Sequence, residues 1–147
     1  MATIEDIKIK IDQLDGGSFQ NLCDAYLSCI GYKNILSLGM KSGTQKTTIG
    51  NPDTYFITSS GQYVFVMYTT QQNDFKKKAL EDIDKCLNPD VTGVQTNDIA
   101  EIIICHTFGR LSAGDDKFLK DYCGDRNVSL ALKGLDTIAT DLYHYHH

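Results

Sequence analysis

Two short apolar segments joined by a polar turn constrain the fold of this chain most strongly. Residues 54–58 and 63–68 each read as a β-strand, and Ser59-Ser60-Gly61-Gln62 between them is a hairpin connection. Gly50-Asn51-Pro52-Asp53 leads into the first strand, and the polar run Thr69–Gln72 follows the second. Because a short connection makes the two strands antiparallel neighbours, the start of the first and the end of the second meet at one end of the hairpin.

Helical and strand-like patterns alternate along the rest of the chain. Helical spacing of apolar residues predicts helices over residues 4–14, 19–30, 75–87, 112–123 and 135–143. Ser18 and Ser112 are the expected N-caps of the second and fourth of these helices. Apolar runs predict further strands over residues 32–38, 99–105 and 128–132, and residues 39–50 read as a polar loop. A hairpin followed by β-α-β units predicts an α/β fold, with a mixed β-sheet flanked by α-helices on both faces.

Length and composition favour one globular domain spanning residues 1–147. The chain is 41% hydrophobic and carries a formal net charge of -5, so contact with nucleic acid would require a local basic patch. No signal segment and no membrane-spanning run is present in the sequence, which predicts a soluble, cytoplasmic protein without a membrane partner. Scattered cysteines without a Cys-x-x-Cys pair predict buried, reduced thiols at Cys23, Cys29, Cys86, Cys105 and Cys123.

Asp53 is the first candidate for chemistry. Pro52 fixes its own backbone and restricts Asn51, so the approach to the Asp53 carboxylate is stiff. Mg²⁺ prefers oxygen ligands such as a carboxylate and can activate water for phosphodiester hydrolysis. Two adjacent strand ends provide a rigid support for such ligands. The alternative is that Asn51-Pro52-Asp53 is only a turn that opens a strand.

The helix that carries Phe19 and Gln20, the Gly50–Asp53 loop and the Val64–Tyr68 strand together resemble the Mrr-like restriction endonuclease family. This family belongs to the PD-(D/E)xK nuclease superfamily, and the likeness extends from about Ser18 to Cys105. It is nearest to the nuclease domains at the N-termini of large bacterial anti-phage proteins with NTPase modules. The resemblance implies a restriction-endonuclease-like fold, Mg²⁺ or Mn²⁺ as cofactor, DNA as substrate, and NTPase or sensor domains further along the chain. Cutting both DNA strands needs two sites, so a homo-oligomer is compatible with this assignment.

The resemblance also implies a set of site residues, from which this chain departs. Asp53 would hold the metal, and Met67 and Thr69 stand where the family has a second acid and a lysine. The main-chain carbonyl of Tyr68 and the amide of Gln20 would complete the ligands. In the polar run after the strand, Gln71 or Gln72 is a candidate for a migrated catalytic or DNA-contacting group, and an ordinary solvated loop is the alternative.

A thioether is a poor Mg²⁺ ligand and Thr69 carries no charge, so this copy is expected to be weakly active or inactive. Three explanations for Met67 stay open: an engineered replacement of Glu, natural loss of catalysis with binding retained, and simple filling of the core.

Four lysines are candidates for contact with backbone phosphates. Lys76, Lys77 and Lys78 lie in the first turns of a predicted helix, and Lys46 precedes Asp53 in the long loop. The alternative for the three consecutive lysines is an ordinary solvated helix face. His106 has no His or Cys partner at metal-ligand spacing, so a structural histidine with satisfied hydrogen bonds is expected there.

The sequence therefore predicts the N-terminal effector domain of a bacterial defence protein, acting as a Mg²⁺-dependent DNA endonuclease with impaired catalysis. A non-catalytic module that binds nucleic acid or protein on the same degenerate fold is the alternative. An RNase with the same frame is a third possibility.

Overall fold

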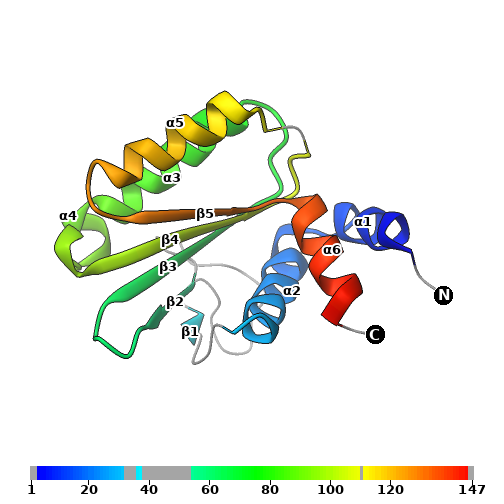
Figure 1. Cartoon of the computed structure of the whole chain (residues 1–147), viewed down its shortest axis with the longest axis horizontal. Coiled ribbons are helices and arrows are strands. Elements are labelled where there is room, and N and C mark those ends of the chain that lie inside the picture. Colours follow the sequence, from blue (N-terminus) through cyan, green and yellow to red (C-terminus); the bar gives the residue numbers. More distant parts are fainter. Residues whose placement is uncertain (1–2, 32–35, 38–53, 110, 146–147) are drawn as a thin grey trace.

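The computed structural model of the chain describes residues 3–31, 36–37, 54–109 and 111–145. Its strands form one mixed sheet in the order β1-β2-β3-β4-β5 (Figure 1). β2 pairs antiparallel with both β1 and β3, whereas β4 pairs parallel with both β3 and β5. Their bounds are β1 Leu36–Ser37, β2 Thr54–Ile57, β3 Tyr63–Thr69, β4 Ile99–His106 and β5 Ser129–Lys133. The predicted α/β fold with a mixed sheet flanked by helices is confirmed.

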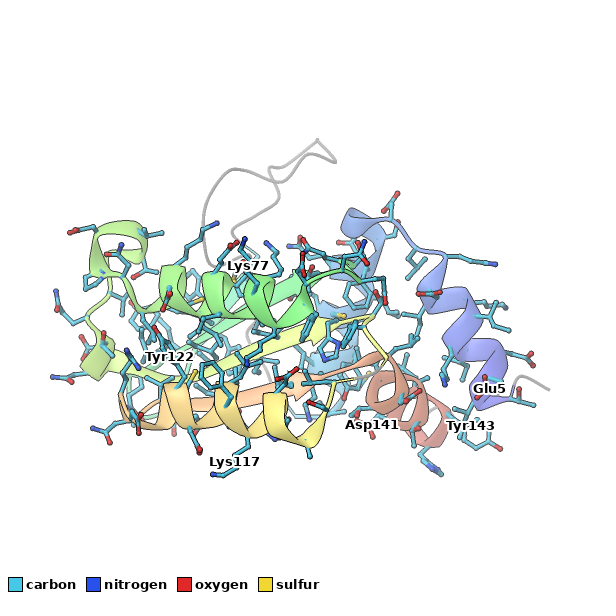
Figure 2. The ribbon with its side chains drawn as sticks, turned by 90° about the horizontal axis from the view of Figure 1, so that it is seen from above. Glu5, Lys77, Lys117, Tyr122, Asp141 and Tyr143 are labelled. Carbon is cyan, nitrogen blue, oxygen red and sulfur yellow. The ribbon has the colours of Figure 1, made fainter. Side chains whose placement is uncertain are left out.

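Helices cover both faces of this sheet (Figure 1). Their bounds are α1 Ile4–Asp12, α2 Gly16–Cys29, α3 Phe75–Leu87, α4 Pro89–Thr92, α5 Ala113–Gly124 and α6 Leu135–Tyr145, with a short 3-10 turn at Thr96–Asp98. α3 and α5 lie side by side on one face, as Figure 2 shows from above, and α1, α2 and α6 lie on the other. The Tyr122 hydroxyl joins the first pair by donating to Asp84, and the Tyr26 hydroxyl donates to Asp141 at 2.5 Å to join α2 to α6.

Strand β3 sits at the centre of the sheet, and its side chains alternate between two hydrophobic cores. Val64 and Val66 pack under α2 and α6, whereas Phe65 and Met67 pack under α3 and α5. This is the alternation that the pleat of any strand imposes. Parallel pairing with β4 continues as far as Thr69↔His106, but the described pairing with β2 ends at Thr54↔Val66. The last three residues of β3 therefore extend past the described part of β2.

Local signals predicted most element boundaries correctly, with two exceptions. Ser112 caps α5 as expected, since its hydroxyl accepts from the Asp115 N–H at 3.1 Å. The expected cap Ser18 is wrong, because α2 already begins at Gly16 and the Asp15 carboxylate accepts from the Ser18 N–H at 2.7 Å. The short helix α4 was not predicted; it begins at Pro89, because proline fits the first turn of a helix.

Of the expected strand at 32–38, the structure describes only β1, and the polar loop 39–50 lies outside the described residues. All five cysteines are free thiols, and four are buried as predicted. Cys29 is exposed, so the prediction is wrong at that position. No helix among the described residues is long and apolar enough to cross a membrane.

Candidate functional site

A pocket of about 350 Å³ lies where β3 ends, at the edge of the sheet that the hairpin pattern marked as the site of chemistry. We refer to it as the β3 pocket. Three elements build it: the beginning of α2, the last residues of β3 with the turn that follows, and α3. Its lining residues are Gly16, Phe19, Tyr68, Thr69, Thr70, Gln71 and Lys78.

Met67, which the resemblance assigned to the position of an acid, is a core residue in this structure. Its side chain is only 3% exposed and belongs to the core under α3 and α5, together with Phe65 and Phe75. The burial agrees with the interpretation that Met67 fills the core, since an unbranched thioether adapts well to such space. Asp53 and Lys46, the two other positions on which the predicted site depended, lie outside the described residues.

Thr69 and Gln71 have roles in the turn that ends β3. The Thr69 hydroxyl accepts from the Gln71 N–H at 3.1 Å, and the Gln71 amide donates to the Asn73 carbonyl at 2.7 Å. The next residue, Gln72, donates to the Thr107 hydroxyl at 2.8 Å and so joins the exits of β3 and β4. These bonds give the polar run a structural role in fixing the floor of the β3 pocket.

On the α2 face, Tyr68 forms a polar cluster that the sequence did not reveal. Its hydroxyl donates to Asp24 and lies 3.0 Å from the Thr54 hydroxyl, which itself donates to Asp24 at 3.2 Å. Burial, followed by the Asp24 carboxylate, raises the pKa of the Tyr68 hydroxyl well above its usual range. The phenol is therefore a fixed donor at neutral pH and holds a carboxylate between the first residue of β2 and the end of β3.

Gln20, expected as a metal ligand, lies one helical turn before Asp24 on α2 and is buried. The spacing of four residues between them was the only sequence signal for Asp24, because it places both on one face of a helix. Within the described part of the chain, no three His, Cys, Asp or Glu side chains come together as metal ligands.

The three consecutive lysines have different surroundings. Lys76 forms an ion pair with Asp115 at 3.4 Å and lies 4.3 Å from the centre of the Phe118 ring, so it ties α3 to α5. Lys77 is exposed on α3 (Figure 2). Of the three, Lys78 is the one that lines the β3 pocket.

Lys78 is positioned from within the protein by a buried carboxylate. Its ammonium lies 3.0 Å from Asp82, one turn further along α3, whose side chain is only 2% exposed. Burial raises the pKa of Asp82 and Lys78 opposes that rise, while Oδ2 of Asp82 has no hydrogen-bond partner among the described residues. A buried carboxylate needs a cation, so Asp82 holds Lys78 near the pocket rather than leaving it to solvent.

Comparison with family models, with curated proteins and with solved structures finds no match to this chain. The class of protein is thus defined by the fold alone: an α/β domain whose described residues form a five-stranded mixed sheet with a pocket at the end of its central strand. Its activity has to be inferred from the chemistry of its own residues.

Proposed function

We propose that this chain is a domain of the Mg²⁺-dependent DNA endonuclease type, active in bacterial anti-phage defence, with hydrolysis impaired in this copy. DNA would bind at the β3 pocket, and further NTPase or sensor domains of the same protein would control it. Cleavage of both strands would require two copies of the domain.

The main support is the position of Lys78. A cation at the end of the central strand is what a negatively charged phosphodiester requires, and Thr69 at the end of β3 supplies none. Lys78 reaches the same pocket from the neighbouring helix, with its ammonium beside the Asp82 carboxylate. The flanking Thr70 and Gln71 add polar groups that can donate to phosphate oxygens.

The described donors do not fit a tight Mg²⁺ site. Position 67 offers a buried thioether, Gln20 offers a buried amide, and Asp24 already accepts hydrogen bonds from Tyr68 and Thr54. A metal would therefore depend on Asp53 with the main-chain carbonyl of Tyr68, one carboxylate fewer than a hard cation prefers. Weak metal binding is the reason to propose that hydrolysis is impaired.

The burial of Met67 favours a second candidate, a non-catalytic binding module on the same fold. In that case the β3 pocket would hold the phosphate backbone of a nucleic acid without cutting it. Both candidates require Lys78 to contact phosphate, and they differ in whether an acid at position 67 restores metal binding.

The test is DNA binding by a pair of matched variants. Lys78→Ala combined with Asp82→Ala removes the cation without leaving a buried carboxylate, and Lys117→Ala combined with Asp121→Ala removes an ion pair of the same spacing from the exposed side of α5. Fluorescence anisotropy with a labelled DNA duplex should give about tenfold weaker binding for the first variant only. The dependence of its affinity on salt should fall by about one released counterion.

Equal DNA affinity of both variants and the unmodified chain would rule out the β3 pocket as the phosphate site. If the unmodified chain binds single-stranded RNA more tightly than duplex DNA, the assignment to DNA is wrong and the RNase alternative gains.

A further inference from the structure

The connections after β4 and β5 leave the sheet on opposite faces. After β4 the chain enters α5, which packs with α3, whereas after β5 it enters α6, which packs with α2. The two strands are parallel neighbours whose carboxyl ends lie side by side, and the segments that follow them diverge towards opposite faces of the sheet (Figure 1). In open α/β sheets such a reversal creates a crevice outside the strand ends, and ligands bind there.

A pocket of about 390 Å³ occupies this position, and we refer to it as the β4–β5 crevice. Its volume is within the range of about 300–1,000 Å³ that is typical of small-molecule sites. Apolar side chains form much of its wall, and the starts of two helices close it. Its wall includes His106, Phe108, Leu132, Leu135, Asp136 and Thr137.

His106 departs at one ring nitrogen from the expectation of a histidine with satisfied hydrogen bonds. It is 3% exposed, and its Nδ1 has no hydrogen-bond partner among the described residues. The ring is fixed between the Phe75 ring, 4.4 Å away between centres, and Gly134, where an added Cβ would lie 2.7 Å from Cε1 of His106. A buried polar atom without a partner costs about 1–3 kcal/mol. The fixed imidazole also lies in the wall of the crevice, where a ligand would pack against it.

The start of α6 presents a second set of unpaired groups to the same crevice. The first bond of this helix runs from the Ile138 N–H to the Gly134 carbonyl at 2.9 Å. The N–H groups of Leu135, Asp136 and Thr137, all in the crevice wall, have no acceptor among the described residues. Free N–H groups and the positive end of the helix dipole favour an anion at this point.

Two carboxylates also line the crevice, and both are compensated. Asp136 forms an ion pair with Lys8 of α1 at 2.6 Å, and Asp116 forms one with Lys120 at 3.1 Å. The lysines offset the negative charge and leave the first turn of α6 open to an anion. Phe108 and Leu132 supply an apolar surface for the rest of a ligand.

We propose that the β4–β5 crevice binds a small phosphorylated ligand of nucleoside monophosphate size. Its phosphate accepts from the N–H groups at the start of α6, and its ring lies on Phe108 and next to His106. The ring and ribose bring polar groups close to the His106 imidazole in the crevice wall. This site is separate from the β3 pocket, and its existence does not depend on the proposed nuclease function.

The test uses the full chain, the four common ribonucleoside monophosphates and inorganic phosphate. Ligand titration followed by the amide NMR signals of residues 135–137 should give a dissociation constant on the order of 1 mM or below for at least one nucleotide. Inorganic phosphate should bind more weakly, because it leaves the apolar wall and His106 uncovered.

Thr137→Glu places a carboxylate in the first turn of α6, where it stabilises the helix but repels a phosphate. It should weaken nucleotide binding about tenfold, while Thr140→Glu, one turn further and outside the crevice wall, should not. The proposal is overturned if no nucleotide binds, if Thr137→Glu binds nucleotide as well as the unmodified chain, or if inorganic phosphate binds as tightly as every nucleotide.

Discussion

The two pockets at the carboxyl ends of the parallel strands differ in where their polar groups come from. In the β3 pocket, charge is supplied by a side chain, Lys78, and the surrounding turn is closed by bonds among Thr69, Gln71 and Asn73. In the β4–β5 crevice, the groups proposed to receive a ligand are backbone N–H groups at the start of α6 and the imidazole of His106.

This difference separates two kinds of recognition. A lysine ammonium presented by a helix can contact the backbone of a long polyanion, whereas fixed backbone donors in an enclosed space suit a small ligand of defined shape. The first kind is sensitive to charge and salt, and the second is sensitive to shape. Substitutions that change one pocket at a time can therefore separate the two.

The largest expected effect is at the buried position beside the β3 pocket. Met67→Glu places a carboxylate at a site that is 3% exposed, which should lower the free energy of unfolding by on the order of 3–5 kcal/mol at neutral pH. Met67→Leu keeps the volume and should cost less than about 1.5 kcal/mol. Urea unfolding measures both, and equal losses would show that position 67 tolerates charge.

The second effect concerns the crevice and depends on pH. Burial lowers the pKa of His106 from 6.5 to about 4. Between these two pH values the imidazole is protonated in the unfolded chain but neutral in the folded chain. Stability contributed by the neutral imidazole is therefore present above pH 6.5 and lost towards pH 4, by about 2–3 kcal/mol at pH 4.5. Asp116 and Asp136 are two carboxylates in the wall of the same crevice.

The difference between the unmodified chain and His106→Gln isolates the histidine from those carboxylates. Urea unfolding at pH 7 and pH 4.5 should show a smaller pH-dependent loss for the variant. The same loss in both proteins would contradict the assigned pKa of His106.

Much of this architecture could be predicted from the sequence, because its signals are local. The turn Ser59–Gln62 fixed the hairpin, the apolar run at 99–105 marked a buried strand, and Ser112 marked the start of α5. The error at Ser18 is also local: Asp15 and Ser18 can both cap a helix, and the helix began at the earlier one.

The polar clusters could not be predicted, because tertiary packing creates them. Asp24 meets Tyr68 across 44 residues, and nothing in the pattern around either residue indicates the other. In the sequence, Lys78 cannot be told apart from Lys76 and Lys77. The structure distinguishes it by its ion pair with the buried Asp82. His106 was expected to have satisfied hydrogen bonds. The sequence does not show that the connections after β4 and β5 leave on opposite faces, which is what places His106 in a crevice wall.

The third effect returns to the β3 pocket. Lys78→Ala should lower the free energy of unfolding by about 1–2 kcal/mol, because it leaves the Asp82 carboxylate buried without its cation. Burial already raises the folded pKa of Asp82 above 3.8, and losing Lys78 raises it further. As the pH rises, Asp82 therefore loses its proton in the unfolded chain before it does in the folded chain. The free energy of unfolding then falls as the pH rises above about 4.

Adding Asp82→Asn to Lys78→Ala should remove that pH dependence, which thermal unfolding across pH 4–8 can follow. A pH dependence that persists in the double variant would mean that another group causes it.

The smallest effect is a gain. Thr137→Glu, which should weaken nucleotide binding in the crevice, should raise the free energy of unfolding by about 0.3–1 kcal/mol through the helix dipole of α6. High salt should reduce the gain. Thermal unfolding in the absence of nucleotide measures it, and a loss of stability would indicate that the start of α6 already has acceptors.

Metal binding by the Met67→Glu chain tests the nuclease assignment most directly. If the end of β3 belongs to a nuclease site, Mg²⁺ or Mn²⁺ should restore part of the stability lost in Met67→Glu, but not in Met67→Gln, because a bound metal stabilises the folded state. The metal-loaded variant should cleave duplex DNA, and adding Asp53→Ala should abolish both effects. A folded Met67→Glu chain whose unfolding is unchanged by millimolar Mg²⁺ and Mn²⁺ would contradict the nuclease account and leave the binding module.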